Sequence, residues 1–307
     1  MIDVIICAKN NKDIISKCLD SIFSQDFRDV NVILVDDGST DGMVEYVGRE
    51  YPKVKVVFGG KGPAENRNIA VRESSGEHIV FLDSDVVLKS GFFSSMVEFI
   101  EKRSSCGIVC ARLLLDDDTI CGIGGVMTKI AGGYDFGFEE KATEYLDSGS
   151  VQVVCSAAIM VRRSVFDKLG GFDGDYFYNY EDTDLSLRAN IAGYGVLYNP
   201  NAIAYHARHV TVDKGFGFSK KKYLRERNML LTYLKNYEVG TLVKYFFPFF
   251  GLVCYKLVFK GNRLSVLKGY FWNLKNFKRI MGKRREVNKL RKVSDKEIFS
   301  RFKVPFI

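Results

Sequence analysis

The chain has 307 residues, enough for one large α/β domain with an appendage or for two modest domains. Hydrophobic residues make up 47% of it and no segment is repetitive, which excludes a repeat protein and a largely disordered one. The net charge of +8 is unevenly divided, because residues 1–213 carry 21 Lys and Arg against 32 Asp and Glu, whereas residues 214–307 carry 24 against 5. This asymmetry predicts that the basic part faces an anionic surface, either nucleic acid or phospholipid.

Apolar runs and helical periodicities alternate through the first 82 residues. Strands are expected at Asp3–Ala8, Val30–Val35, Val54–Phe58 and Ile79–Leu82. Helices are expected between them, at Asp13–Ser24, Met43–Glu50 and Ala64–Ser74. Alternation at this spacing predicts a doubly wound, mostly parallel sheet.

The pattern continues less regularly after residue 105. Further expected elements are a strand at Val151–Val161, helices at Arg163–Leu169 and Glu181–Ala192, and short strands at Val196–Asn199 and Ile203–Tyr205. The seven Cys follow no metal-binding spacing, so we expect free, buried thiols in a reducing cytoplasm. The first residues enter a strand without a basic segment or cleavage site, which argues against a signal peptide.

Two aspartates follow the fourth predicted strand. Asp83 and Asp85 come directly after the apolar run Ile79–Leu82. Ligands of open α/β sheets bind at the carboxyl ends of the strands, and two carboxylates there suit Mg²⁺ or Mn²⁺, which would bind a diphosphate. The alternative is a solvated turn, since Asp favours turns through local hydrogen bonds.

More acidic and polar motifs follow other predicted elements. They are Val35-Asp36-Asp37-Gly38-Ser39-Thr40-Asp41, Gly62-Pro63-Ala64-Glu65-Asn66-Arg67-Asn68, Gly170-Gly171-Phe172-Asp173, Glu181-Asp182-Thr183-Asp184 and Tyr205-His206. In this order, with Asp83 and Asp85, they resemble the motifs of the family 2 glycosyltransferases over roughly residues 1–215. These are inverting enzymes with a GT-A fold. One departure is Cys7-Ala8-Lys9, which stands where the family has Pro-Thr-Tyr before an Asn.

The resemblance implies a metal-dependent transfer of one sugar from a nucleoside-diphosphate sugar to a lipid-linked or glycan acceptor. It implies Asp182 as the general base, with Glu181 as the second candidate. The implied donor-binding residues are Ala8, Asn10, Asp37, Arg67 and Asp83. The implied ligands of Mg²⁺ or Mn²⁺ are Asp85, Asp83 and His206.

Several of these residues also have a structural alternative. Asp36 and Asp37 could be turn and cap residues, and Arg67 a solvated helix residue. Glu181 and Asp182 could simply favour the N-terminus of a helix through its dipole.

The histidines and the overall function also have alternatives. His206 could be structural, and His209 is a weaker candidate for the same contact. The chain could also be a catalytically silent sugar-nucleotide-binding module. Processive family members carry a Gln-x-x-Arg-Trp signature, which neither Gln25 nor Gln152 fits, and this favours transfer of a single sugar.

Residues 214–307 are expected to form a basic, aromatic helical region beside a catalytic domain of residues 1–213. The segment Val239–Phe259 has spanning length only if it includes Lys244 and Lys256. We therefore expect interfacial helices at Leu242–Phe259 and Val266–Met281.

Interfacial helices would make the protein peripheral at the inner face of the membrane, and positive charge would strengthen this attachment. Lys283-Arg284-Arg285 and Lys289–Lys292 would attract an anionic leaflet. The alternative is a helical subdomain packed on the catalytic domain. Nucleic acid is disfavoured as a partner, because no recognised nucleic-acid-binding motif accompanies the charge.

Overall fold

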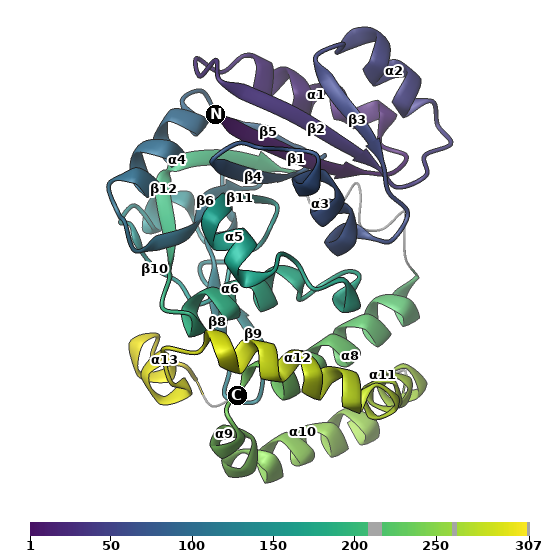
Figure 1. Cartoon of the computed structure of the whole chain (residues 1–307), viewed down its shortest axis with the longest axis vertical. Helices are drawn as coiled ribbons and strands as arrows, with labels where there is room; N and C mark the ends of the chain where they lie inside the picture. Colours follow the sequence, from purple (N-terminus) through teal and green to yellow (C-terminus); the bar gives the residue numbers. More distant parts are fainter. Residues whose placement is uncertain (208–216, 260–262, 306–307) are drawn as a thin grey trace.

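A computed structural model describes residues 1–207, 217–259 and 263–305 (Figure 1). Its strands are β1 (Ile2–Ala8), β2 (Val30–Asp36), β3 (Val54–Phe58), β4 (His78–Asp83), β5 (Val86–Leu88), β6 (Cys106–Leu114), β7 (Ile120–Gly122), β8 (Gly125–Met127), β9 (Gly133–Asp135), β10 (Gly149–Ser150), β11 (Ala158–Arg162) and β12 (Gly195–His206). All but β8 and β9 belong to one mixed sheet, whose main path runs β10-β12-β6-β11-β4-β1-β2-β3.

The N-terminal part of this sheet is parallel, as the strand–helix alternation predicts. Strands β3, β2, β1 and β4 pair in parallel, whereas β11 is antiparallel to both β4 and β6. Ala8 pairs with Asp36, and Cys7 pairs with Asp83. The carboxyl ends of β1, β2 and β4 therefore meet at one edge, and the motifs that follow them lie together.

Helices cover both faces of the sheet. Those of the first two-thirds of the chain are α1 (Lys12–Phe23), α2 (Met43–Glu50), α3 (Pro63–Arg72), α4 (Phe92–Glu101), α5 (Arg163–Leu169) and α6 (Glu181–Ile191), with 3₁₀ turns η1 (Ala142–Glu144) and η2 (Gly174–Tyr176). One apolar cluster joins α1, α2 and α4 to the sheet, and another joins α3, α5 and α6 to it. Ile15, Leu19 and Ile22 on α1 are buried, which confirms the predicted helical period.

Two predicted strands have different bounds. Strand β12 is one continuous strand with a register shift between Asn199 and Ile203, where two strands were expected. The expected strand at Val151–Val161 is regular only from Ala158, in β11. Val151, Val153 and Val154 are buried all the same, because a loop packs against the core there, with only isolated pairings of Val151 with Val196 and of Val153 with Gly125.

The C-terminal part of the chain is helical. Its elements are α8 (Phe218–Asn236), α9 (Val239–Lys244), α10 (Phe246–Phe259), α11 (Arg263–Lys275), α12 (Phe277–Leu290) and α13 (Asp295–Arg301). They lie at the end of the molecule opposite α2 and β3 (Figure 1). No helix among the described residues is long and apolar enough to cross a membrane. The expected boundary between residues 213 and 214 lies outside the described residues.

These helices differ sharply in burial. Helix α8 buries ten residues, several of them charged or polar, between α6, α11 and α12. Helix α10, in contrast, buries only Phe249, and Phe247 is 80% exposed. The two expected interfacial helices therefore have other bounds in the structure, with breaks after Lys244 and after Lys275. A long helix that the sequence did not suggest, α8, connects them to the catalytic domain.

The tail's charges correct one expectation. Lys283 Nζ pairs with Asp173 and, at 2.5 Å, with Asp175, and Arg284 is buried and donates to the Leu234 carbonyl at 2.6 Å. The expectation that both face an anionic leaflet is therefore wrong, because they neutralise and bridge groups inside the protein. The thiols also differ from expectation: all seven are free, but Cys155 and Cys254 are exposed.

Candidate active site

A chain of ion pairs crosses the carboxyl edge of the sheet. Arg67, on α3, is 5% exposed and lies between two carboxylates. Its Nη2 is 3.1 Å from Asp83 Oδ1, and its Nη1 is 2.8 Å from Glu181 Oε1. The alternative of a solvated Arg67 is therefore wrong. A guanidinium fork suits such a position, because it can bind two carboxylates and still offer further N–H groups.

Asp85 and His206 extend this chain on the other side of Asp83. His206 Nε2 lies 3.3 Å from Asp85 Oδ1 and 4.0 Å from Asp83 Oδ2. One ligand atom from each of the three residues lies within 4.8 Å of the other two. Two carboxylates and an imidazole in this arrangement fit a divalent cation. The fit extends to burial, since the side chains of Asp85 and His206 are 3% and 10% exposed.

A contact of Nδ1 sets the orientation of the His206 ring. Cys121 Sγ lies 3.5 Å from Nδ1, which leaves Nε2 facing the aspartates. Burial opposes the charged imidazole, but hydrogen bonds with Asp85 and Cys121 and the charges of Asp83 and Asp85 raise the pKa of His206 to about 10. This site therefore attracts positive charge. His209, the weaker candidate, lies outside the described residues.

Glu181 and Asp182 open helix α6, and their surroundings differ. Glu181 is 4% exposed and has one oxygen on Arg67. Asp182 is partly exposed, and its two oxygens accept backbone N–H groups from Ser156 at 3.0 Å and Thr183 at 2.7 Å. Burial raises the pKa of both carboxyls, that of Glu181 to about 7 with a contribution from the charge of Asp182. Both are better proton acceptors than an ordinary carboxylate.

The turn after β2 contains two aspartates, one that holds the turn together and one that is partly exposed. Asp36 is buried and accepts N–H groups from Gly38 at 3.1 Å and Ser39 at 3.1 Å, so the turn alternative holds for it. Asp37 is partly exposed, and its Oδ1 accepts from Asn66 Nδ2 at 2.6 Å. Asn66 thus orients the aspartate that the resemblance places on the donor nucleotide.

The end of strand β1 is hydrogen-bonded to the same turn. The Asp37 N–H donates to the Ala8 carbonyl at 3.0 Å. Asn10 has φ 55° and accepts from the Thr40 N–H at 2.8 Å, while its own N–H donates to Ser39 Oγ at 2.9 Å. All the residues assigned to the donor therefore lie at one edge of the sheet, although their roles come from the resemblance.

A strained segment precedes α6. Phe177, Asn179 and Tyr180 have φ of 63°, 69° and 75°, backbone conformations that residues other than Gly rarely adopt. Gly62, the N-cap of α3, has φ 83°, and a Cβ there would lie 2.5 Å from the Phe177 ring. The segment therefore contacts the helix that carries Arg67 and leads directly into Glu181 and Asp182.

Sequence reasoning did not identify Ser156, Cys121 or Asn66 as parts of the site. Ser156 acts through its backbone N–H, so no residue type could have indicated it. Cys121 and Asn66 act through other side chains. Asn66 lies inside a recognised motif, which is the one signal that could have found it.

Comparisons with known proteins show the family of the chain. The model of the family described as Glycosyl transferase family 2 matches residues 3–170. Rhamnosyltransferase WbbL of Escherichia coli K12 is 27% identical over an alignment of 239 residues, with coverage of 73% of this chain and 88% of the relative. The N-acetylglucosaminyl-diphospho-decaprenol L-rhamnosyltransferase of Mycobacterium tuberculosis is 27% identical over an alignment of 212 residues, with coverage of 60% of this chain and 69% of the relative.

Solved structures share the fold. GalNAc-T7 with UDP, GalNAc and Mn²⁺ superposes with a TM-score of 0.67 and 13% identity, over 99% of this chain and 58% of that one. The mannosyltransferase PcManGT from Pyrobaculum calidifontis, in complex with GDP-Man and Mn²⁺, has a TM-score of 0.54 and 16% identity, over 94% of this chain and 85% of that one. At these identities the likeness concerns the fold alone, which is the predicted GT-A fold with a helical C-terminal region.

Proposed function

The chain belongs to the family 2 glycosyltransferases, with rhamnosyltransferases among its relatives, and we propose that it is a metal-dependent inverting enzyme that transfers one sugar. One observation carries the proposal. Side chains in contact run from His206 and Asp85 through Asp83 and Arg67 to Glu181, the neighbour of Asp182. A site for a cation and a candidate base are thereby held in one network, which suits the attack of a hydroxyl on a sugar whose leaving group is a diphosphate.

The donor in this proposal is a nucleoside-diphosphate sugar. In this assignment Asp37 binds the edge of the nucleobase, Ala8 and Asn10 bind the ribose, and Asp83 binds the ribose and the sugar. Arg67 binds oxygens of the nucleobase or the phosphates through the N–H groups that do not pair with its two carboxylates. Support for these roles comes from the family motifs and from the way Asn66 orients Asp37.

Asp83, Asp85 and His206 would hold Mg²⁺ or Mn²⁺. Bound there, the cation supplies positive charge for the departing diphosphate. The mixed set of two carboxylates and one imidazole favours Mn²⁺, because Mg²⁺ prefers oxygen ligands. The solved structures of GalNAc-T7 and PcManGT contain Mn²⁺, which supports the same choice.

Asp182 is our choice of general base. Its carboxylate takes the proton of the acceptor hydroxyl while that oxygen bonds to the anomeric carbon and the bond to the diphosphate breaks. Attack from the face opposite the leaving group inverts the configuration. Asp182 is partly exposed and oriented by two backbone N–H groups, whereas Glu181 is buried and occupied by Arg67.

A release assay tests this function. Purified protein is given a panel of sugar nucleotides with Mn²⁺, Mg²⁺ or EDTA, and free nucleoside diphosphate is measured. We expect release with a cation and none with EDTA. Binding of a sugar nucleotide without release, in the presence of lipid-linked and glycan acceptors, would support the alternative of a silent binding module.

The acceptor in our proposal is lipid-linked or a glycan, and a lipid-linked acceptor would bring the protein to a membrane. The relative from Mycobacterium tuberculosis is named for a decaprenol-linked acceptor. Helices α9–α11 expose a set of apolar side chains that we call the apolar surface: Val239, Val243, Phe246, Phe247, Phe250, Tyr255, Val258, Phe259, Leu264, Leu267, Phe271 and Leu274. Twelve exposed apolar side chains on three successive helices suit contact with an apolar partner.

We propose that this partner is an anionic membrane at its cytoplasmic face, reached by a region of residues 214–307 beside a catalytic domain of residues 1–213. Lys268, Lys275 and Lys278 are exposed among the apolar residues and suit anionic headgroups. This arrangement is peripheral, because the apolar side chains would enter only the headgroup layer.

Vesicle flotation tests the membrane proposal. Phe247→Ser with Leu274→Ser should lower binding to anionic vesicles at least tenfold, while Phe58→Ser, a change of an equally exposed side chain on the catalytic domain, should not. Alkaline carbonate should release the bound protein. Retention after carbonate, or equal binding by the double variant, would contradict a peripheral apolar contact.

A further inference from the structure

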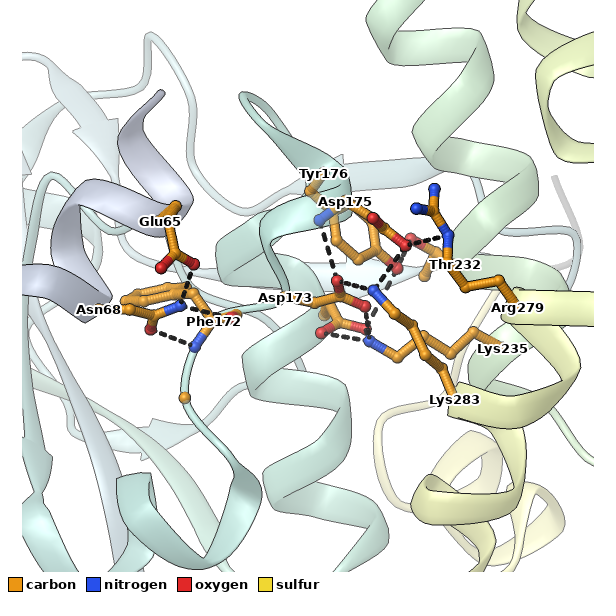
Figure 2. Close-up of polar contacts among 12 residues, drawn as sticks. Glu65, Asn68, Phe172, Asp173, Asp175, Tyr176, Thr232, Lys235, Arg279 and Lys283 are labelled. Atoms are coloured by element: carbon orange, nitrogen blue, oxygen red, sulfur yellow. Dashed lines mark hydrogen bonds and ion pairs between the residues drawn. The ribbon is translucent and has the colours of Figure 1, made fainter. Parts of the chain in front are cut away.

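The loop that precedes the candidate base is held from both sides by side chains of other elements. On one side, Asn68 of α3 binds the backbone of Phe172 twice, donating to its carbonyl at 2.8 Å and accepting from its N–H at 2.9 Å. On the other side, Lys235 and Lys283 of the C-terminal helices both point at Asp173 (Figure 2). Residues 172–180 therefore lie between the donor-binding part of the molecule and the tail.

The C-terminal helices hold the start of this loop with buried charges. Lys235 Nζ is 2.6 Å from Asp173 Oδ2 and 2.9 Å from Asp184 Oδ1, and its side chain is only 4% exposed. Asp184 lies two residues after Asp182, on α6. Lys235 thus ties α8 both to the loop and to the first turn of the helix that bears the candidate base.

At the strained end of the loop, one side-chain amide binds three backbone carbonyls. Asn228, on α8, is fully buried, and its Nδ2 donates to the carbonyls of Tyr176 at 3.0 Å, Tyr178 at 2.9 Å and Asn179 at 2.6 Å. Three carbonyls converge there because the residues around them adopt left-handed conformations. Without this amide, the carbonyls of Tyr178 and Asn179 would lose this donor, whereas that of Tyr176 would keep the Tyr178 N–H at 2.7 Å.

Arg227 fixes which way this amide points. Its Nε donates to Asn228 Oδ1 at 2.8 Å, so the nitrogen of the amide must face the loop. Its Nη2 donates to the carbonyls of Asp175 and Tyr176, each at 2.7 Å. Together the two residues satisfy four successive or nearly successive carbonyls in the loop, and the Tyr180 carbonyl then accepts from Asp184 in the first turn of α6.

We propose that Asn228, oriented by Arg227, is a positioning residue of the transfer reaction: it holds residues 176–179 in the strained conformation that presents Asp182 to the acceptor. This inference rests on the proposed role of Asp182 as the base. It makes the C-terminal helices part of the catalytic unit, since the tail supplies the contact that fixes the start of α6. Donor binding should depend little on this contact, because Asp37, Asp85 and His206 lie on other elements and Arg67 keeps its partners Asp83 and Glu181.

The test compares two buried asparagines. Asn228→Ala removes the contact with the loop. Asn273→Ala is the matched control, because Asn273 is also fully buried and its Nδ2 donates to two carbonyls that lie outside the loop, those of Arg227 and Gly269, at 2.9 Å each. Fluorescence of Trp272, the one tryptophan of the sequence, checks the fold near Arg227, whose guanidinium lies 4.7 Å above its ring.

We expect kcat for transfer to fall at least tenfold in Asn228→Ala while the KM for the donor stays within threefold. Asn273→Ala should keep kcat within threefold even if its Tm falls. Asn228→Asp should lose at least as much activity as the alanine variant, because it places an oxygen against three carbonyls. Unchanged kcat in Asn228→Ala, or an equal loss in Asn273→Ala, would overturn the proposal.

Two further measurements separate this inference from the proposed function. Asp182→Asn is assayed beside the asparagine variants, and if it keeps full transfer, the choice of base is wrong. Hydrogen exchange of residues 174–180 does not depend on that choice. Exchange at least tenfold faster in Asn228→Ala than in Asn273→Ala supports the positioning role, and equal exchange overturns it. If neither asparagine variant folds, the same exchange comparison is made with Asn228→Ser and Asn273→Ser.

Discussion

The two halves of the active site are built in different ways. In the donor half, residues follow the ends of the neighbouring parallel strands β1, β2 and β4, and many contacts lie within one turn, such as those of Asp36 with Gly38 and Ser39. In the acceptor half, the loop before Asp182 depends on α8 and α12, which follow it by roughly 50 to 110 residues in the sequence.

This difference has a functional consequence. A change in the donor half removes a ligand of the donor or of the cation, whereas a change in the acceptor half alters how a hydroxyl and its base are presented. Donor affinity and transfer rate should therefore respond separately to substitutions in the two halves. Arg67 belongs to both, since it bridges Asp83 and Glu181.

The largest effect is expected in the donor half. Asp85→Asn should abolish transfer, because a neutral amide replaces a charged ligand in a buried site for a hard cation. Initial rates over a range of Mn²⁺ concentrations measure the loss. Turnover close to that of the unmodified protein at saturating Mn²⁺ would remove Asp85 from the site.

The next effect separates the halves. Asp182→Asn should lower kcat by about 10²–10⁴-fold and leave the Kd for the donor within a few-fold, since a general base acts only on the acceptor. Glu181→Gln should instead weaken donor binding, because a neutral amide replaces the charged partner that holds Arg67. Isothermal titration with the sugar nucleotide and steady-state rates distinguish the two. A collapse of donor affinity in Asp182→Asn would make Glu181 the better candidate.

The donor half was predictable from sequence because its structure is local. An apolar run followed by Asp83 and Asp85 indicates a buried strand and its carboxyl end, and parallel strands bring such ends together. The resemblance then supplied roles for Asp37, Arg67 and Asp182. Arg67 in particular could not be placed by composition alone, because its burial depends on two carboxylates from distant elements.

The acceptor half and the tail were less predictable, for a physical reason. Lys283 and Arg284 have the sequence pattern of a surface polybasic cluster, but Lys283 pairs with two aspartates more than 100 residues earlier, and Arg284 is buried against α8. Long-range ion pairs leave no periodic signal. Likewise, Asn228 satisfies backbone carbonyls, and such contacts are independent of the residue types that provide them.

A third prediction tests how far the acceptor half depends on the tail. Lys235→Met should lower the free energy of unfolding by about 3–5 kcal/mol, because it leaves the buried carboxylates of Asp173 and Asp184 without this partner. Urea unfolding measures the change. Lys289→Met is the control, since that ammonium is exposed and pairs with exposed Glu286, and it should change stability by less than about 0.5 kcal/mol. A loss below 1 kcal/mol in Lys235→Met would show that the charge cluster is dispensable.

The smallest expected effect is the pH dependence of stability at the junction of the halves. Burial, then the charge of Asp182, raises the pKa of Glu181 to about 7, although Arg67 opposes the shift. A carboxyl with a raised pKa binds its proton more tightly in the folded state. Its contribution to stability is therefore complete below its unfolded pKa of about 4.5 and disappears as the pH rises through about 7.

Urea unfolding of the unmodified protein and of Glu181→Gln, compared between pH 5 and pH 8, measures this contribution. Relative to the glutamine variant, the unmodified protein should lose about 1–3 kcal/mol over that range. Asp173 gives the opposite sign, because Lys235 and Lys283 outweigh burial and lower its pKa, so its contribution is lost only as the pH falls below about 4. A constant difference between the two proteins from pH 5 to pH 8 would mean that Arg67 keeps Glu181 ionised, and would assign that pair to the donor half.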